Sequence, residues 1–325
     1  MLKKFLVAAI FVAVILVLVF VSQGKKTEED ILRIGYLPLA DHLPLMVAAG
    51  EDLFEGVSVE LVRFSDWPSL VESLRSGGID GAHIINTLAV KMAYDGFDGQ
   101  VVALSHRGHI ELSAGNHIHS VNDLREGDIA VPTRFSPHYM MLHNFLTQEG
   151  IEMDIDVGIL DVAPPDFVST VASGGTDAFI GSQPFPAMAE NLGVSRTIKH
   201  WHDMQIEGTN GLDCVIFFPT DFIDKNEDLI QNYVNSIIYT GEFIQENPQR
   251  SAEAASEFML NIDPEIILEA MQAGTYSELM LIESEFTAFQ DYMIELGLIS
   301  APIDLEKFLN KDFAQNAYKQ IKETN

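Results

Sequence analysis

Cysteine and positive charge are both scarce in this chain of 325 residues. Cys214 is the only cysteine, so the sequence excludes an intramolecular disulfide and predicts no cysteine-based metal site. It lies in the apolar run 212–218, which predicts a buried and inert thiol. Lysine and arginine total 19 against 48 acids, a net charge of −29. Such a surface repels nucleic acid, so a nucleic-acid partner is excluded.

Motifs of common enzymes are also missing. The sequence holds no Gly-x-Ser-x-Gly elbow, no phosphate loop and no dinucleotide fingerprint. We therefore predict that the chain is not an enzyme and needs no cofactor. Two His-x-His pairs, His117/His119 and His200/His202, have the spacing of chelating residues on a strand. No third ligand of obvious geometry lies beside either pair, so we predict no metal site there.

The first thirty residues carry a targeting signal. Lys3 and Lys4 precede an unbroken apolar run over 5–21, and Lys25 and Lys26 follow it. The run reaches the lower limit for spanning a bilayer, and no clear cleavage site ends it. It is either a cleaved signal peptide or an uncleaved signal-anchor, and both place the rest of the chain outside the cytoplasm.

A repeated stretch organises the exported part. Residues 67–82 align without a gap with residues 164–179 at a constant offset of 97, sharing Pro-x-x-Val and Ser-Gly-Gly-x-Asp. In each copy proline opens a short helix, Ser-Gly-Gly ends it and a buried strand follows. We expect Asp80 and Asp177, at the strand starts, to stabilise the turns. Two matched units a hundred residues apart predict two similar α/β lobes.

The order of the other expected elements supports this organisation. Strands and helices alternate through residue 105 and again from 128 to 201, which indicates mainly parallel sheets. A strand near 211–218 should return to the first sheet, and the remainder reads as helices, the last over 305–322. We predict a linker to residue 30, lobe 1 over 31–113, lobe 2 over 114–210, and a return to lobe 1 over 211–325. The hinges are expected near 112–117 and 205–212.

Four segments resemble a known family. They are Ile34-Gly-Tyr-Leu-Pro-Leu, Phe64-Ser-Asp-Trp-Pro-Ser-Leu, Leu74-Arg-Ser-Gly-Gly-Ile-Asp-Gly-Ala-His and Leu104-Ser-His-Arg. The sequence is similar to substrate-binding proteins of ABC transporters, in the nitrate/sulfonate/taurine/bicarbonate branch that includes NMT1/THI5-like pyrimidine-precursor binders. The resemblance implies a type II periplasmic-binding-protein-like fold with two lobes. It also implies a monomer that captures a small molecule and delivers it to the permease of an importer.

The candidate site follows from the sheet topology. Ligands of open α/β sheets bind outside the carboxyl ends of the strands. The offset of 97 pairs Asn86 with Gln183, so each lobe offers one amide at the same place. The loop 133–138 is the best anion candidate, with Ser136 as N-cap, Pro137 at the first helical position and Arg134 as a bidentate donor. The predicted ligand-binding residues are Asp41, His42, Trp67, Asn86, Thr87, Arg107, Arg134, Ser136, His138, Gln183 and Phe185.

Three hypotheses on the function remain open at this point. The first is a small anion held by Arg134 and the helix N-terminus. The second is a neutral heteroaromatic such as a pyrimidine, stacked by Trp67, Phe135 and Phe185. The third is an enzyme of the same fold, for which Cys214 gives little support. Arg107 could instead form a salt bridge, and Trp67 could instead pack in the core; each interpretation competes with a role in the site.

Overall fold

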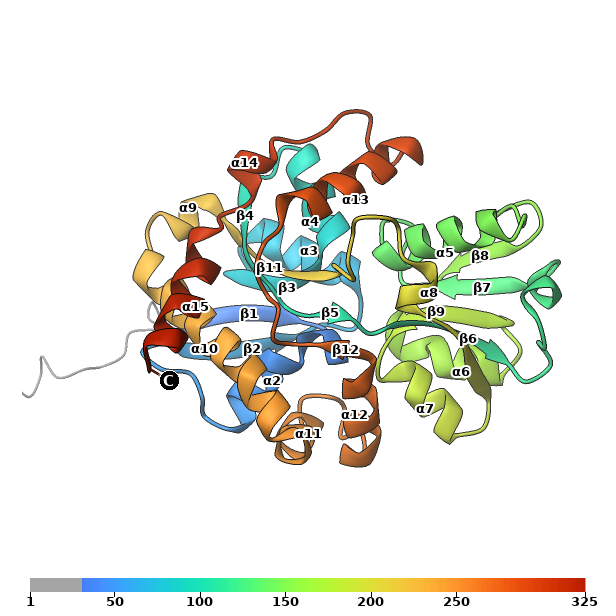
Figure 1. Cartoon of the computed structure of the whole chain (residues 1–325), viewed down its shortest axis with the longest axis horizontal. Coiled ribbons are helices and arrows are strands. Elements are labelled where there is room, and N and C mark those ends of the chain that lie inside the picture. Colours follow the sequence, from blue (N-terminus) through green and yellow to red (C-terminus); the bar gives the residue numbers. More distant parts are fainter. Residues whose placement is uncertain (1–30, 325) are drawn as a thin grey trace, which may run out of the picture.

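Two five-stranded sheets divide the molecule into two lobes (Figure 1). The structure is a computed structural model that describes residues 31–324. The predicted targeting segment lies outside the described residues. Between residues 31 and 324, no helix has the length and apolar character needed to cross a membrane.

The sheet of lobe 1 has the strand order β2-β1-β3-β11-β4. Strand β1 pairs in parallel with β2 and β3, whereas β11 is antiparallel to both of its neighbours. The predicted return of the chain to the first sheet is therefore confirmed, and the returning strand runs against the others. The strands are β1 Ile31–Tyr36, β2 Ser58–Arg63, β3 Gly81–Ile85, β4 Gly99–Leu104 and β11 Cys214–Pro219.

The sheet of lobe 2 repeats this arrangement. Its order is β10-β6-β9-β7-β8, with β7 parallel to β8 and β9, and β6 antiparallel to β9 and β10. Read from β8, the order matches that of lobe 1 strand for strand, and β6 takes the place of β11. The strands are β6 Ile110–Gly115, β7 Asp128–Val131, β8 Gly158–Asp161, β9 Ala178–Ser182 and β10 Ser195–His200.

The sequence repeat coincides with equivalent elements of the two sheets. Adding 97 to both ends of β3 gives both ends of β9. Helix α3 (Trp67–Ser76) is capped by Asp66 and ends at Gly77, whose φ of 75° favours glycine. Its counterpart is the 3-10 turn η4 (Pro164–Asp166) followed by α6 (Phe167–Ala172). The predicted duplication of architecture is confirmed.

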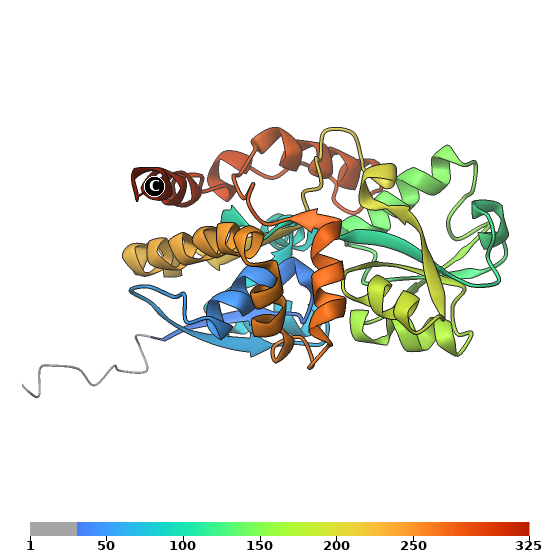
Figure 2. The ribbon, with the colours of Figure 1, turned by 60° about the horizontal axis from the view of Figure 1, so that its bottom comes forward.

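The helices cover the two sheets and the junction between them. In Figure 2 the orange and red C-terminal helices lie along lobe 1 and reach its junction with the green second lobe. Contacts of α12 with α7 and of α13 with α5 tie the lobes together, as predicted. The helix expected over 305–322 is two helices, because Leu309 and Asn310 bridge to Val101 on the edge strand β4. The longer helices are α2 Leu43–Gly50, α4 Asn86–Tyr94, α5 Pro137–Gln148, α7 Phe185–Asn191, α10 Glu227–Glu246, α11 Pro248–Ser256, α12 Pro264–Ala270, α13 Glu283–Glu295 and α15 Asp312–Thr324, and the shorter ones include η2 Ala40–His42, η3 Val121–Leu124, α8 Trp201–Met204, α9 Thr220–Ile223, η5 Met271–Ala273 and α14 Leu305–Phe308.

The first crossing between the lobes lies earlier than predicted. Strand β6 belongs wholly to the second sheet, so the crossing falls at 105–109, and a hinge at 112–117 is wrong. The polar residues Glu111 and Ser113 obscured this strand in the sequence, although both are buried by pairing with β10. The second crossing, 201–213, contains the predicted hinge 205–212. A third connection pairs β5 (Arg107–Gly108) with β12 (Gly274–Thr275).

The lobes are packed against each other. One hydrophobic core runs through lobe 1 and continues into Met140, Phe167 and Phe179 of lobe 2. The backbone N–H of Ala40 donates to the carbonyl of Gln183 at 2.8 Å, and the Thr87 hydroxyl donates to the carbonyl of Phe135. The structure therefore represents a closed arrangement of the two lobes.

Candidate functional site

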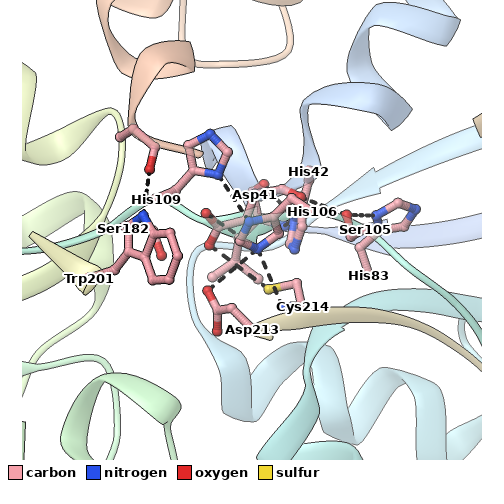
Figure 3. A network of polar contacts seen from close by, with 12 residues as sticks. Asp41, His42, His83, Ser105, His106, His109, Ser182, Trp201, Asp213 and Cys214 are labelled. Atoms are coloured by element: carbon pink, nitrogen blue, oxygen red, sulfur yellow. Dashed lines mark hydrogen bonds and ion pairs between the residues drawn. The ribbon is translucent and has the colours of Figure 1, made fainter. Parts of the chain in front are cut away.

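A cluster of polar side chains is enclosed where the lobes meet (Figure 3). Four of its members follow the carboxyl ends of β1 and β4 in lobe 1, two after each strand, and two more precede or begin β11. Because β11 is antiparallel, its first residues lie at the same edge of the sheet as the carboxyl ends of its neighbours. We call this set the interlobe cluster: Asp41, His42, His83, Ser105, His106, His109, Asp213 and Cys214 from lobe 1 and the crossing, with His138 and Ser182 from lobe 2.

Four of these residues direct their side chains at one point. The Nε2 atom of His106 lies 3.6 Å from Oδ1 of Asp41 and 3.5 Å from Oδ2 of Asp213. The Sγ atom of Cys214 lies 3.9 Å from Oδ2 of Asp41. All four ligand atoms lie within 4.8 Å of one another, and all four side chains are fully buried. The group contains two carboxyls, one imidazole and one thiol.

Burial alters the acid–base behaviour of this group. It raises the pKa of the Asp213 carboxyl to about 6, and His138 opposes the shift. The pKa of Asp41 is raised well above its usual range, first by burial and then by the nearby Asp213. Burial likewise raises the pKa of the Cys214 thiol. Two acids close together in a dry site disfavour double ionisation, so one proton between them stabilises the pair.

The histidines around the acids are neutral. Burial lowers the pKa of His42 and of His106 to about 3, and that of His138 to about 4. Burial also lowers the pKa of His83, whose ring bonds to the hydroxyls of Ser105 and Tyr233. Neutral imidazoles offer one donor and one lone pair each. The cluster therefore contains no cationic side chain that would balance the two acids.

Lobe 2 closes the cluster with a hydroxyl and an imidazole. Ser136 is the N-cap of α5 and accepts from the backbone N–H of Tyr139 at 3.1 Å, with proline at the first helical position, as predicted. This first turn brings His138 to Ser182 at the end of β9, with 2.8 Å between Nε2 and Oγ. The Ser182 hydroxyl also hydrogen-bonds the Asp41 carboxyl. Ser182 thus connects the two lobes.

The two predicted amides lie at equivalent places at the junction. The Asn86 side chain donates to the carbonyl of Asp213 at 2.9 Å, and its Oδ1 is buried without a hydrogen-bond partner. The Gln183 side chain accepts from the backbone N–H of Ala187 at 3.2 Å. Both amides are thus partly engaged by the backbone, and their role in ligand binding stays a prediction.

The two predicted arginines are engaged in ion pairs outside the interlobe cluster. Arg107 is buried and contacts Glu285 at 3.0 Å, in addition to three backbone carbonyls. Arg134 makes a bidentate pair with Asp154 at 2.7 and 2.9 Å and bonds the carbonyl of Ile159. The competing interpretation of a salt bridge thus describes Arg107. In the closed structure an acid already balances the positive charge of each guanidinium group.

The predicted aromatic residues are packed in the core. Trp67 is buried and meets the ring of His42 edge to face, with 5.9 Å between centroids. Phe185 is buried against Phe167, with 6.4 Å between centroids. Core packing therefore describes Trp67 in this structure, and stacking on a ring-shaped ligand stays a hypothesis.

The His-x-His pairs lie on the surface with acidic partners. His117 contacts Asp177 at 2.8 Å, and His200 contacts Glu111 at 2.9 Å. His200 and His202 border a groove of about 560 Å³ whose lining also includes Glu111, Glu190 and Glu269. Within residues 31–324, the group of three or more histidine, cysteine and acidic side chains that lie close enough to share one ion is the buried four.

Sequence reasoning missed two members of that group. Asp213 was not nominated, and Cys214 was interpreted as inert because its neighbours in sequence are apolar. Burial of Cys214 is confirmed, but its neighbours in space are Asp41 and Asp213. The absence of a cysteine-based metal site stays a prediction, but the thiol is grouped here with an imidazole and two carboxyls, which the sequence did not indicate. The usable signal was an Asp-Cys pair at the start of a strand that returns to the first sheet.

The fold and the cluster define a two-lobed protein with the periplasmic-binding-protein architecture. The chain belongs to the NMT1-like family, whose sequence model matches residues 25–259. It is similar to the nitrate import ATP-binding protein NrtC of Synechococcus elongatus, with 25% identity over 307 residues, which are 87% of this chain and 42% of that protein. The chain thus spans less than half the length of this relative.

Solved structures share the fold. The ligand-binding component of an ABC-type import system from Staphylococcus aureus, solved with zinc bound, has a TM-score of 0.80 and 22% identity, over 89% of this chain and 99% of that chain. The periplasmic nitrate-binding protein NrtA from Synechocystis has a TM-score of 0.81 and 18% identity, over 90% of this chain and 89% of that chain. The predicted two-lobed fold is confirmed.

Proposed function

We propose that this protein is the extracytoplasmic solute-binding component of an ABC importer. It encloses a small solute between its two lobes and presents the closed form to a membrane permease. The observation that carries the proposal is the interlobe cluster, where Asp41 and His106 of lobe 1 meet Ser182 and His138 of lobe 2 out of contact with water. Burying polar groups costs free energy, so they are enclosed only where a ligand or hydrogen bonds among themselves satisfy them.

The family and the solved relatives support this function. The Staphylococcus aureus protein is described as a ligand-binding component of an ABC-type import system, and the Synechocystis protein as a periplasmic nitrate-binding protein. We extend the importer role to this chain as a monomeric receptor whose N-terminal segment directs it out of the cytoplasm. The permease and, where that segment is retained, the membrane are its proposed partners.

Closure of the lobes is the proposed mechanism. A solute that binds both jaws shifts the equilibrium toward the closed form, in proportion to its preference for that form. The bonds from Ala40 to Gln183 and from Thr87 to Phe135 form only when the lobes meet. A permease that recognises the closed surface thereby distinguishes the loaded receptor from the empty one.

The class of the solute is a separate question. The small anion predicted from the sequence, such as nitrate, a sulfonate or bicarbonate, depends on Arg134 and Arg107. Each arginine is held by an acid, and the enclosed groups of the interlobe cluster are acids and neutral histidines. An anion at this site therefore requires neutral N–H and O–H donors or release of Arg134 from Asp154. If Arg134 makes the direct contact, Arg134→Ala weakens anion binding by roughly 1.5–3 kcal/mol.

A ligand panel tests the receptor proposal. Nitrate, an alkanesulfonate, bicarbonate and a pyrimidine are each measured by calorimetry, and small-angle X-ray scattering follows the shape of the protein. A receptor gives saturable binding together with a smaller radius of gyration. Stabilisation by the uncharged heterocycle alone would reject the anion, and unchanged affinity in Arg134→Ala would make that residue a bystander. Turnover of a bound ligand that is lost in Cys214→Ala would instead identify an enzyme.

A further inference from the structure

We propose that Asp41, His106, Asp213 and Cys214 form a tetrahedral binding site for a divalent transition-metal ion, with zinc as the best fit. The inference names a ligand for the enclosed site and rests on the proposed function, because an ion reaches that site only when the lobes open. All four residues come from lobe 1 and the crossings next to it, as Figure 3 shows for their side chains.

The spacing of the four side chains matches such an ion. Bonds of about 2.0–2.3 Å from zinc to oxygen, nitrogen and sulfur separate tetrahedral ligand atoms by about 3.3–3.7 Å. The observed separations are 3.5 Å from His106 to Asp213, 3.6 Å from His106 to Asp41 and 3.9 Å from Cys214 to Asp41. These distances join His106 to one oxygen of Asp41 and Cys214 to the other, and all four ligand atoms lie within 4.8 Å of one another, so an ion that binds them draws the side chains closer together.

The carboxyl oxygens are arranged as ligands that lack a partner. Oδ1 of Asp41 and both oxygens of Asp213 are buried and receive no hydrogen bond from residues 31–324. The ion-paired arginines Arg107 and Arg134 are engaged elsewhere. Unpaired carboxyls in a fully buried site are costly, and a dication bound to them removes that cost.

The imidazole of His106 is oriented as in known metal sites. Its Nε2 faces the carboxyls and accepts a long bond of 3.3 Å from the backbone N–H of Cys214, which a bound ion would replace, while its Nδ1 lies 3.0 Å from Nδ1 of His109. A metal-bound histidine typically uses its second nitrogen to bond an outer partner, which fixes the ring. His109 is placed to be that partner, and Ser182 supports Asp41 in the same way.

The donor set selects the metal. Calcium and magnesium favour six or more oxygen ligands, whereas a set of one sulfur, one nitrogen and two carboxylate oxygens suits zinc and similar ions. Coordination replaces the S–H bond of Cys214 by a bond to the metal, and both the thiol proton and the proton shared by Asp41 and Asp213 leave to solvent. The ion then brings two positive charges to a site with three anionic ligands.

Cobalt(II) titration of the full chain tests the site. Tetrahedral cobalt with a thiolate gives a sulfur-to-cobalt charge-transfer band in the near ultraviolet and intense visible bands, and zinc should displace it. Cys214→Ser should abolish the charge-transfer band, and Asp213→Asn should weaken zinc binding about 100-fold or more, while His109→Gln should weaken it about 10- to 100-fold. His200→Gln is the matched control, because it removes a histidine from the acidic surface groove and should change nothing.

Four outcomes separate the proposals. The metal site is overturned if the native chain binds cobalt octahedrally without the charge-transfer band, or if His200→Gln is the variant that alone loses binding. Circular dichroism of each metal-free variant shows whether a lost band reflects unfolding, and Cys214→Ala gives a second variant at the same position. If a solute of the panel binds and compacts the protein while zinc does not, the receptor stands and the metal site fails. If zinc binds at the four residues but no solute of the panel binds or compacts the protein, the metal site stands and the solute-receptor proposal fails.

Discussion

The two lobes have the same strand order but contribute very different chemistry to their junction. Lobe 1 and the crossings beside it supply the acids, the thiol and most of the buried histidines, whereas lobe 2 supplies Ser182 and His138. The matching positions Asn86 and Gln183 are both amides with backbone partners. In the proposed receptor, the repeated scaffold fixes where the site lies, while loops outside the repeat decide what binds. Lobe 1 is then the proposed binding platform, and lobe 2 closes over it.

The first prediction concerns the core of the repeated unit. Leu70 and Phe167 occupy the same position of the two copies and are fully buried, with Phe167 stacked on Phe179 at 5.1 Å. Phe167→Ala should cost about 3–5 kcal/mol and Leu70→Ala about 2–5 kcal/mol of unfolding free energy, measured by urea denaturation. The exposed serines Ser76→Ala and Ser173→Ala are matched controls and should change it by less than about 0.5 kcal/mol. A cost near that of the controls in one lobe would show that its copy of the repeat is not part of the core.

The second prediction compares the two shared aspartates. Asp80 accepts from the backbone N–H of Arg33 at 2.8 Å and from two of its guanidinium nitrogens, whereas Asp177 accepts from the N–H of Asp128 at 2.9 Å and contacts His117. Asp80→Ala should cost about 1–2 kcal/mol and Asp177→Ala about 1 kcal/mol, since His117 and part of Arg33 are exposed to solvent. Neither variant should change solute or zinc affinity. A loss of binding in Asp80→Asn with stability intact would contradict the scaffold role.

Much of the fold was predictable because its signals are local. Proline, Ser-Gly-Gly and a buried strand recur at an offset of 97, and the strands expected over 79–85 and 177–181 are β3 and β9, with ends that differ by at most two residues. The rule for carboxyl ends of strands likewise led to Asp41, His42 and His138, which the structure brings into the interlobe cluster. Capping of α5 by Ser136 was also predictable from the sequence.

The remainder depends on pairings that local patterns do not encode. Asp213 and Cys214 lie at the amino end of β11, which joins the site edge only because that strand is antiparallel. Arg107 is neutralised by Glu285, which is 178 positions away in the sequence. Glu111 interrupts the apolar pattern of β6, so the first crossing was placed too late. In each case a partner distant in sequence determines where the residue lies or what its side chain contacts.

The third prediction tests a hydrogen bond that joins lobe 1 to lobe 2. The hydroxyl of Thr87 in lobe 1 donates to the carbonyl of Phe135 in lobe 2. Thr87→Val should weaken any ligand held by the closed form about fivefold, which corresponds to about 1 kcal/mol, and Thr87→Ser should restore it. Calorimetry gives the affinity, and scattering gives the open fraction. Thr220→Val, which loses a bond to Asp98 within lobe 1, is the control and should leave both unchanged. A direct ligand contact by Thr87 would instead lower affinity without changing the open fraction of the empty protein.

The smallest expected effect is a pH dependence of closure. His143 of α5 in lobe 2 and Tyr292 of α13 meet across the junction, with 2.9 Å between Nδ1 and the hydroxyl. Burial lowers the pKa of His143 and raises that of Tyr292 to about 12, so the neutral tyrosine donates to a neutral imidazole. When the lobes open, His143 returns toward its usual pKa near 6.5 and binds a proton more readily. The open form therefore gains protons first as the pH falls below about 6.5, and acidification should favour opening.

The ratio of affinities at pH 7 and pH 5.5, compared between the native chain and His143→Gln, measures this contribution. Tyr292→Phe is the matched variant that removes the donor. A ratio unchanged by His143→Gln would show that the contact closes the lobes independently of pH.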